Sequence, residues 1–131
     1  MIVGIGHDIA DMDRIEKILS GHTSKRFMER ILTKNELELA MRYEGKRLVQ
    51  FVSGRFAAKE AVVKAIGCGI GDKVGFGDID IMPDVTGKPG CSLSDEAWRR
   101  IDRSPEAERI HVTISHDRSI ASAVAVMERL G

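Results

Sequence analysis

Cysteine is scarce in this sequence. Of 131 residues only Cys68 and Cys91 are cysteines, and no second pair accompanies them. Neither a disulfide scaffold nor a four-ligand zinc site is therefore indicated. His7 and His22 have no metal-ligand partner at helical spacing, which also disfavours zinc. Reduced thiols are the expectation.

The chain also lacks an excess of charge of either sign, because 20 Lys and Arg residues balance 20 Asp and Glu residues. Such a molecule has no overall field that would draw it to nucleic acid or to an anionic membrane, and neither is expected as a partner. The charge is nevertheless uneven along the chain. Between residues 14 and 30, five basic residues outnumber two acidic ones, a net charge of +3.

Long apolar runs and repeats are absent as well. No apolar run approaches the length of a membrane span. Gly4, Gly6, His7 and Asp8 interrupt the amino terminus before a signal-peptide core could form. These absences predict a cytoplasmic protein.

What the sequence does contain is typical of a globular domain. Hydrophobic residues make up 43% of it and charged residues 31%, which excludes disorder and coiled-coil composition. A chain of this length buries enough surface to fold without cross-links. We therefore expect one domain over residues 1–131.

Helical patterns dominate the first half of the chain. Residues 2–6 first form a short buried strand, whose glycines let another backbone or a ligand come close. Asp8 or Asp11 can then cap a helix over residues 11–20, which places Asp8 at a strand-to-helix junction. Further helices are predicted at 24–31, from about 34 to 44 behind a Thr33/Glu36 capping box, and at 48–66.

Strand patterns dominate the second half. The apolar period changes to two at residues 79–81, 110–115 and 119–127, while residues 86–89 form a turn and 94–103 a short helix. This order favours an α+β fold with an antiparallel three-stranded sheet and a long central helix. A small sheet with apolar faces and open edges would gain by packing on copies of itself, so a homo-oligomer is expected.

Two carboxylates are candidates for metal binding. Asp8 follows a glycine-containing strand, and Glu60 is flanked by alanines in the long helix. Together they could hold Mg²⁺, which takes one or two protein oxygens and fills its shell with water and substrate phosphate. Taken alone, the spacing favours a structural alternative, in which Asp8 caps a helix and Glu60 pairs with Lys64 one turn later.

Several basic residues are candidates for phosphate binding. Lys64 precedes a GxGxG run that begins at Gly67, and an ammonium beside exposed glycine backbone suits a pyrophosphate. The alternative for Gly67 is an ordinary helix C-cap. His116, at a strand end, could stack on a base or bind a phosphate, or it could simply be solvated. The same choice applies to the cations near the start of the long helix, Lys46, Arg47 and Arg55.

These pieces occur in a specific order. Gly6-His7-Asp8 with Arg14 matches a G-x-D motif followed six residues later by Arg, and residues 54–65 match G-R-F-A-A-K-E-A-x-x-K-A without a gap. Other matching segments follow in order: Arg26-Phe27, Glu29-Arg30-Ile31-Leu32, the glycines of 67–71, Gly87-Lys88-Pro89 and Ser115-His116. Over nearly its whole length the chain resembles the acyl-carrier-protein synthase family of 4′-phosphopantetheinyl transferases; residues 90–109 match no motif.

The resemblance implies an enzyme that moves the 4′-phosphopantetheine arm of coenzyme A (CoA) to a serine of apo acyl carrier protein in fatty acid biosynthesis, releasing 3′,5′-ADP. It implies Mg²⁺ on Asp8 and Glu60, with Lys64 beside them as a catalytic residue at the pyrophosphate. The remaining CoA-binding residues that it implies are Lys46, Arg47, Arg55, Gly67, Lys88, Pro89 and His116.

The resemblance also implies partners. The family is typically a homotrimer with active sites between protomers, so Lys46 and Arg47 can act on a neighbour's CoA. Arg14, Arg26 and Arg30 lie in the segment of net charge +3 and are candidates for docking an acidic carrier protein. Two alternatives stay open: a CoA- or nucleotide-binding module without turnover, and a magnesium-dependent pyrophosphohydrolase.

Overall fold

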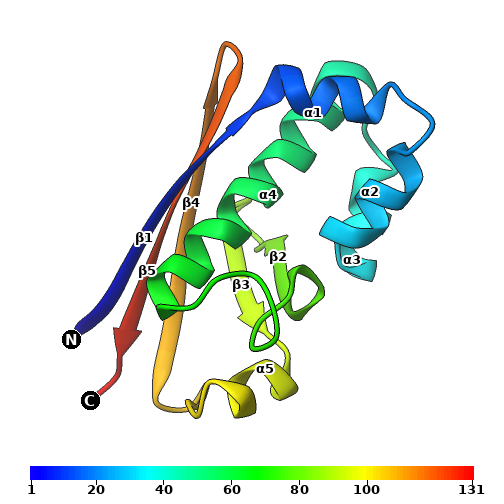
Figure 1. Cartoon of the computed structure of the whole chain (residues 1–131). Helices are drawn as coiled ribbons and strands as arrows, with labels where there is room; N and C mark the ends of the chain where they lie inside the picture. The colour runs from blue at the N-terminus through cyan, green and yellow to red at the C-terminus, as the bar shows by residue number, and fades with distance from the viewer.

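Five antiparallel strands form the only sheet of the computed structural model, which describes residues 1–131. Their order is β1-β5-β4-β3-β2, and Figure 1 shows the first three as long neighbours, with β3 and β2 short. The bounds are β1 (Ile2–Asp11), β2 (Ile79–Pro83), β3 (Pro89–Leu93), β4 (Glu108–Asp117) and β5 (Ile120–Arg129). The predicted α+β class and antiparallel pairing are confirmed, but the predicted number of three strands is wrong.

The two uncounted strands are β1 and β3. β3 reads PGCSL, and its proline and glycine hide the alternation expected of a strand. It nevertheless pairs with β2 across the turn after Pro83, with Ile81 opposite Cys91. β1 pairs with β5 and so belongs to the same sheet. The local pattern thus predicted a strand at residues 2–6 but not its place in the sheet, and it missed β3, because pairing with a neighbour decides both.

β1 is also longer than the predicted strand at 2–6. Its pairing continues through Asp8, opposite Ala123, and ends at Asp11. Asp11 is the N-cap of α1 (Met12–Leu19), because its Oδ1 accepts the N–H groups of Asp13 and Arg14 at 2.9 and 3.3 Å. Asp8 therefore lies inside a strand, and the predictions that it sits at a strand-to-helix junction or caps a helix are wrong.

The helices agree with the sequence patterns more closely. They are α2 (Ser24–Ile31), α3 (Lys34–Ala40), α4 (Gly45–Ile66) and α5 (Asp95–Arg100), with a 3-10 turn η1 (Phe76–Asp78). The Thr33/Glu36 capping box is present. In Figure 1, α4 runs along the sheet between the long strands and the group formed by α2 and α3. The longest predicted helix is therefore the centre of the fold.

The backbones of β1 and α4 pack directly against each other. A Cβ atom on Gly4 would lie 1.9 Å from the carbonyl oxygen of Ala65, and one on Gly6 would lie 1.9 Å from that of Ala61. Only glycine admits such an approach. The prediction that the glycines of the first strand let another backbone come close is confirmed.

The two faces of the long strands differ. The face toward α4 is lined by small buried residues, including Ala121, Ala123 and Ala125 of β5. The opposite face carries the exposed side chains of Ile5 and Ile9, which are 67% and 55% accessible. The large apolar residues of β1 thus point away from the core, because the side facing the helix has no room for them.

No helix of the protein combines the length and the apolar character needed to cross a bilayer. Cys68 and Cys91 are both free. Burial raises the pKa of the Cys91 thiol to about 12, so this thiol stays protonated at neutral pH.

Candidate functional site

A cleft of about 300 Å³ lies beside the first half of α4. The β2–β3 turn and the end of β4 form its other sides. Its lining residues are Leu39, Tyr43, Arg47, Gln50, Phe51, Gly54, Arg55, Pro83, Gly87, Pro89, Ile114 and His116. Four predicted CoA-binding residues thus meet in one cavity: Arg47, Arg55, Pro89 and His116.

Aromatic rings and guanidinium groups alternate along the helical wall of this cleft. The Arg47 guanidinium lies 5.2 Å from the Tyr43 ring centroid, and that of Arg55 lies 4.3 Å from the Phe51 ring. The two rings are 5.4 Å apart. Burial lowers the pKa of Arg55, but a guanidinium remains charged at any physiological pH. The wall therefore presents fixed positive charge beside flat apolar surface.

The opposite wall is a turn held by one carboxylate. Asp84 Oδ1 accepts hydrogen bonds from the Thr86 N–H at 2.8 Å, the Thr86 hydroxyl at 2.7 Å and the Lys88 N–H at 3.1 Å. Gly87 has a φ of +87°, which the turn requires and which favours glycine. The pKa of Asp84 is lowered chiefly by the bonds from Thr86. This turn is therefore preformed.

None of the predicted CoA-binding lysines, Lys46, Lys64 and Lys88, lines the cleft. The side chain of Lys88 is absent from its lining, although Gly87 and Pro89 on either side are present. Lys46 instead borders a separate hollow of about 500 Å³ between α1, the start of α4 and the β4–β5 turn at Arg118. Within one protomer, Lys46 and Arg47 thus point to different cavities.

Asp8, Glu60 and Lys64 form a second centre, where β1 meets the last part of α4. Lys64 Nζ donates to Asp8 Oδ1 at 2.9 Å and to the His7 carbonyl oxygen at 3.1 Å. Burial raises the pKa of the Glu60 carboxyl, the negative charge of Asp8 raises it further, and Lys64 acts in the opposite direction. Lys64 thus pairs with Asp8, so the alternative pairing with Glu60 is wrong.

This second centre fits a divalent cation such as Mg²⁺. The Asp8 carboxylate lies close enough to Glu60 to raise the pKa of Glu60, and the Lys64 ammonium contacts the Asp8 carboxylate. Mg²⁺ needs one or two carboxylates, with substrate phosphate and water completing its shell. The structure contains no cluster of three or more potential ligands among His, Cys, Asp and Glu.

Gly67 has an ordinary structural role. Its φ is +96°, and its N–H donates to the Val63 carbonyl as the left-handed C-cap of α4. A Cβ on Gly69 or Gly71 would meet nothing within 4 Å. The C-cap alternative for Gly67 is confirmed, and its predicted contact with CoA stays a prediction.

The two centres lie on different sides of α4. Asp8 belongs to the edge strand β1, whereas Ile114 and His116 of the cleft belong to β4, with β5 between them. Neither Asp8, Glu60 nor Lys64 lines the cleft. One protomer therefore holds a cationic cleft and an acidic pair that do not meet.

Comparison with known proteins decides the family. Residues 4–123 match the family model described as the 4'-phosphopantetheinyl transferase superfamily. The chain is 48% identical over 128 residues to a holo-[acyl-carrier-protein] synthase of Bacillus cereus, covering 98% of this chain and 97% of that one. The chain belongs to the 4′-phosphopantetheinyl transferase superfamily. The family resemblance carried by its motifs is thereby confirmed.

Solved structures of the superfamily agree in fold. One is a holo-(acyl-carrier-protein) synthase from Bacillus anthracis in complex with CoA (3',5'-ADP), with a TM-score of 0.83, 45% identity and 99% coverage of both chains. Another, from Helicobacter pylori in complex with coenzyme A, has a TM-score of 0.81 and 33% identity, and covers 95% of this chain and 99% of that one.

Several cleft residues of this phosphopantetheinyl transferase were not predicted. Tyr43 and Phe51 alternate with Arg47 and Arg55 at intervals of four residues, which places all four on one side of the helix and its lead-in. This four-residue spacing could have predicted that Tyr43 and Phe51 line the cleft. No spacing pattern of this kind includes Gln50.

The predicted carrier-docking arginines are exposed on the two helices that follow β1. Arg14 lies on α1, and Arg26 and Arg30 lie on α2. None of their side chains makes an ion pair within this chain, whereas Lys64 and Arg100 do. They are available to an acidic partner.

Proposed function

We propose that this phosphopantetheinyl transferase moves the 4′-phosphopantetheine arm of CoA to a serine hydroxyl of an apo acyl carrier protein, releasing 3′,5′-ADP. The observation that carries the proposal is the cleft, where Arg47, Arg55 and His116 converge beside aromatic rings. The relatives at 48% and 45% identity over nearly the whole chain support the same reaction.

The cleft has the chemistry to bind the nucleotide end of CoA. Guanidinium groups form bidentate, charge-assisted hydrogen bonds with phosphate oxygens, so Arg47 and Arg55 suit the ribose phosphate. His116 can bond a phosphate or face the base. Pro89 and the preformed turn before it supply apolar surface. Lys88 and Gly67 stay as outer CoA-binding candidates.

The acidic pair suits the pyrophosphate end. Asp8 and Glu60 would hold Mg²⁺, which when bound neutralises the charge on the pyrophosphate that the serine hydroxyl attacks. Lys64 reaches the same place, because its ammonium already touches Asp8. Its donors can orient pyrophosphate oxygens while the carboxylates set the position of the reacting group.

A homotrimer with sites between protomers would bring the two centres together. The exposed Ile5 and Ile9 form an apolar face on an edge strand, which is a surface that a second copy can cover. Lys46 and Arg47, which face different cavities within one protomer, could then serve different CoA molecules. Arg14, Arg26 and Arg30 are proposed to dock the acidic carrier. The cytoplasmic location stays a prediction from the sequence.

One assay separates this function from the two alternatives. The protein is incubated with CoA, Mg²⁺ and an apo acyl carrier protein, and the carrier is followed by intact mass. A transferase adds one phosphopantetheine mass to the carrier. A binding module leaves both the carrier and CoA unchanged, whereas a pyrophosphohydrolase consumes CoA even when the carrier is omitted.

A further inference from the structure

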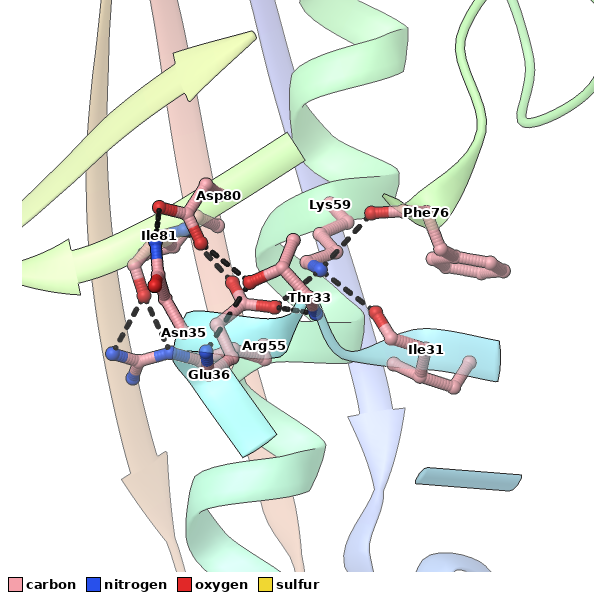
Figure 2. A network of polar contacts seen from close by, with 9 residues as sticks. All are labelled: Ile31, Thr33, Asn35, Glu36, Arg55, Lys59, Phe76, Asp80 and Ile81. Atoms are coloured by element: carbon pink, nitrogen blue, oxygen red, sulfur yellow. Dashed lines mark hydrogen bonds and ion pairs between the residues drawn. The ribbon is translucent and has the colours of Figure 1, made fainter. Parts of the chain in front are cut away.

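A fully buried ion pair joins α3 to α4 in the interior of the molecule. The Nζ atom of Lys59 lies 2.6 Å from Oε1 of Glu36, and both side chains are 0% exposed. Lys59 Nζ also donates to the carbonyl oxygens of Ile31 at 2.7 Å and Phe76 at 3.1 Å. All three ammonium donors are thus used, as Figure 2 shows.

The carboxylate of Glu36 is equally well satisfied. Its Oε1 also accepts the Thr33 N–H at 2.7 Å, and its Oε2 accepts the Ile81 N–H at 2.8 Å. Thr33 is the N-cap of α3, whereas Ile81 is the middle residue of β2. The ion pair therefore joins α2, α3 and α4 to η1 and β2, although Glu36 and Ile81 are 45 residues apart in the sequence.

Ile81 connects this network to the cleft. β2 is an edge strand with no neighbour beyond it, so the peptide groups of Ile81 that face outward need other partners. Glu36 accepts its N–H, and Arg55 donates to its carbonyl oxygen from Nε at 3.2 Å and from Nη2 at 3.1 Å. A continuous chain of contacts thus runs from Lys59 through Glu36 and Ile81 to Arg55 (Figure 2).

Stability alone is a weak reason for such an arrangement. Burial lowers the pKa of Lys59, and the Glu36 carboxylate acts against that loss of charge. Desolvating two charges costs about as much as their attraction returns, and apolar residues of similar size often replace a buried ion pair without loss of stability. Apolar residues cannot replace the directional hydrogen bonds that Glu36 accepts from the Ile81 N–H and that Lys59 donates to the Phe76 carbonyl oxygen.

We propose that Glu36 and Lys59 are positioning residues for CoA, which hold β2 against α4 so that the Arg55 guanidinium stays at its place in the cleft. This inference rests on the proposed binding of CoA in that cleft. Neither residue lines the cavity, so the pair acts through Ile81 and Arg55.

The test replaces the pair by apolar residues and measures CoA affinity by calorimetry on the full chain. Glu36→Leu with Lys59→Met is expected to weaken CoA binding about tenfold, the loss expected when a charged hydrogen-bonding group is misplaced. Arg55→Ala should have a similar effect. The Glu36/Lys59 replacement and Arg55→Ala disturb the same contact. The triple variant that combines them should therefore bind CoA no more weakly than whichever of the two variants binds CoA less tightly.

The control is an ion-paired, buried carboxylate outside the cleft, Glu108, whose arginine partners are partly exposed. Glu108 is 4% exposed, and its carboxylate lies 3.6 Å from Arg103 and 3.5 Å from Arg129. Arg103→Met with Glu108→Leu should leave CoA affinity unchanged. A further readout separates positioning from general damage: for the Glu36/Lys59 variant, the KM for CoA should rise while the KM for the carrier protein does not.

Three results would overturn the inference. In the first, the Glu36/Lys59 variant binds CoA as the wild type does although Arg55→Ala does not. In the second, the effects of the two changes add in the triple variant. In the third, Arg55→Ala itself binds CoA normally, which rejects the assignment of the cleft and the positioning role with it. If the double replacement does not fold, Glu36→Gln serves instead, since one oxygen cannot satisfy both Lys59 and Ile81.

Discussion

The two sides of α4 meet their neighbours in different ways. Toward β1 the contact is direct, with Gly4 and Gly6 against the backbone of α4 at Ala65 and Ala61. Toward β2 it is made by polar side chains, with Glu36, Lys59 and Arg55 bridging the elements. The first contact is set by the absence of side chains and the second by their chemistry. Substitutions at the first contact should therefore mainly reduce stability, and substitutions at the second should mainly change CoA binding.

We expect the largest loss of stability from a substitution at the contact between β1 and α4. Gly6→Ala places a Cβ 1.9 Å from a backbone oxygen, which neither β1 nor α4 can relieve without moving. We expect a loss of at least about 3 kcal/mol in the free energy of unfolding, the upper range for overpacking. Urea denaturation measures it. Gly69→Ala, whose Cβ meets nothing, is the control, and equal stability of the two variants would contradict the contact.

The second largest effect is expected at Glu60, where a substitution should abolish catalysis but leave the fold intact. Glu60→Gln keeps the volume of the side chain but removes the charge that Mg²⁺ needs. We expect the transfer rate to fall by about two orders of magnitude or more, with unchanged circular dichroism. The measurement is the rate of holo-carrier formation at low millimolar Mg²⁺. A rate near that of the wild type would reject the metal assignment.

The same variant should change how stability depends on pH. The folded-state pKa of Glu60 is raised, so the folded protein binds this proton more tightly than the unfolded chain does. Its contribution to the stability of the folded state is fully present below the pKa of the unfolded carboxyl and is lost as the pH rises through the higher folded-state pKa. Glu60→Gln should therefore be more stable relative to the wild type at pH 7 than at pH 4. Thermal unfolding at the two pH values decides it, and a constant difference would contradict the coupling.

On the cleft side, a single cation should affect binding more than folding. Arg47→Ala removes a guanidinium that packs on Tyr43 at the cavity wall. The KM for CoA should rise about tenfold, the usual scale for one charge-assisted hydrogen bond. Arg42→Ala, an exposed arginine outside the lining, is the control. Equal KM values for the two variants would argue that the ribose phosphate binds elsewhere.

The smallest effect is expected on the carrier-docking arginines. Arg26→Glu reverses an exposed charge and should raise the KM for the carrier protein several-fold at low salt and less at high salt, with CoA affinity unchanged. Steady-state kinetics at two ionic strengths measure this. Arg99→Glu on α5 is the control. If both reversals leave the carrier KM alone at low salt, the docking surface lies elsewhere.

The two sides of α4 also differ in how far the sequence predicted them. On the β1 side, the small size of Gly4, Gly6 and the alanines of α4 predicts close packing. The motif around Glu60 predicted the acidic pair. The place of Asp8 within its strand could not be predicted, because the strand is extended by pairing with β5. β3 and the bridge from Glu36 to Ile81 were missed for a related reason: both depend on partners about 10 to 45 residues away.

We propose that the cleft of one protomer and the acidic pair of another make one active site. Mixing two impaired variants at a CoA concentration below the wild-type KM tests it directly: Glu60→Gln, which keeps the cleft, and Arg47→Ala with Arg55→Ala, which keeps the acidic pair. After subunit exchange, mixed oligomers should contain sites with both halves intact, and transfer of phosphopantetheine to the carrier should return. If the mixture exchanges subunits, as shown by mass, yet is no more active than the two variants measured separately, the two centres do not combine between protomers.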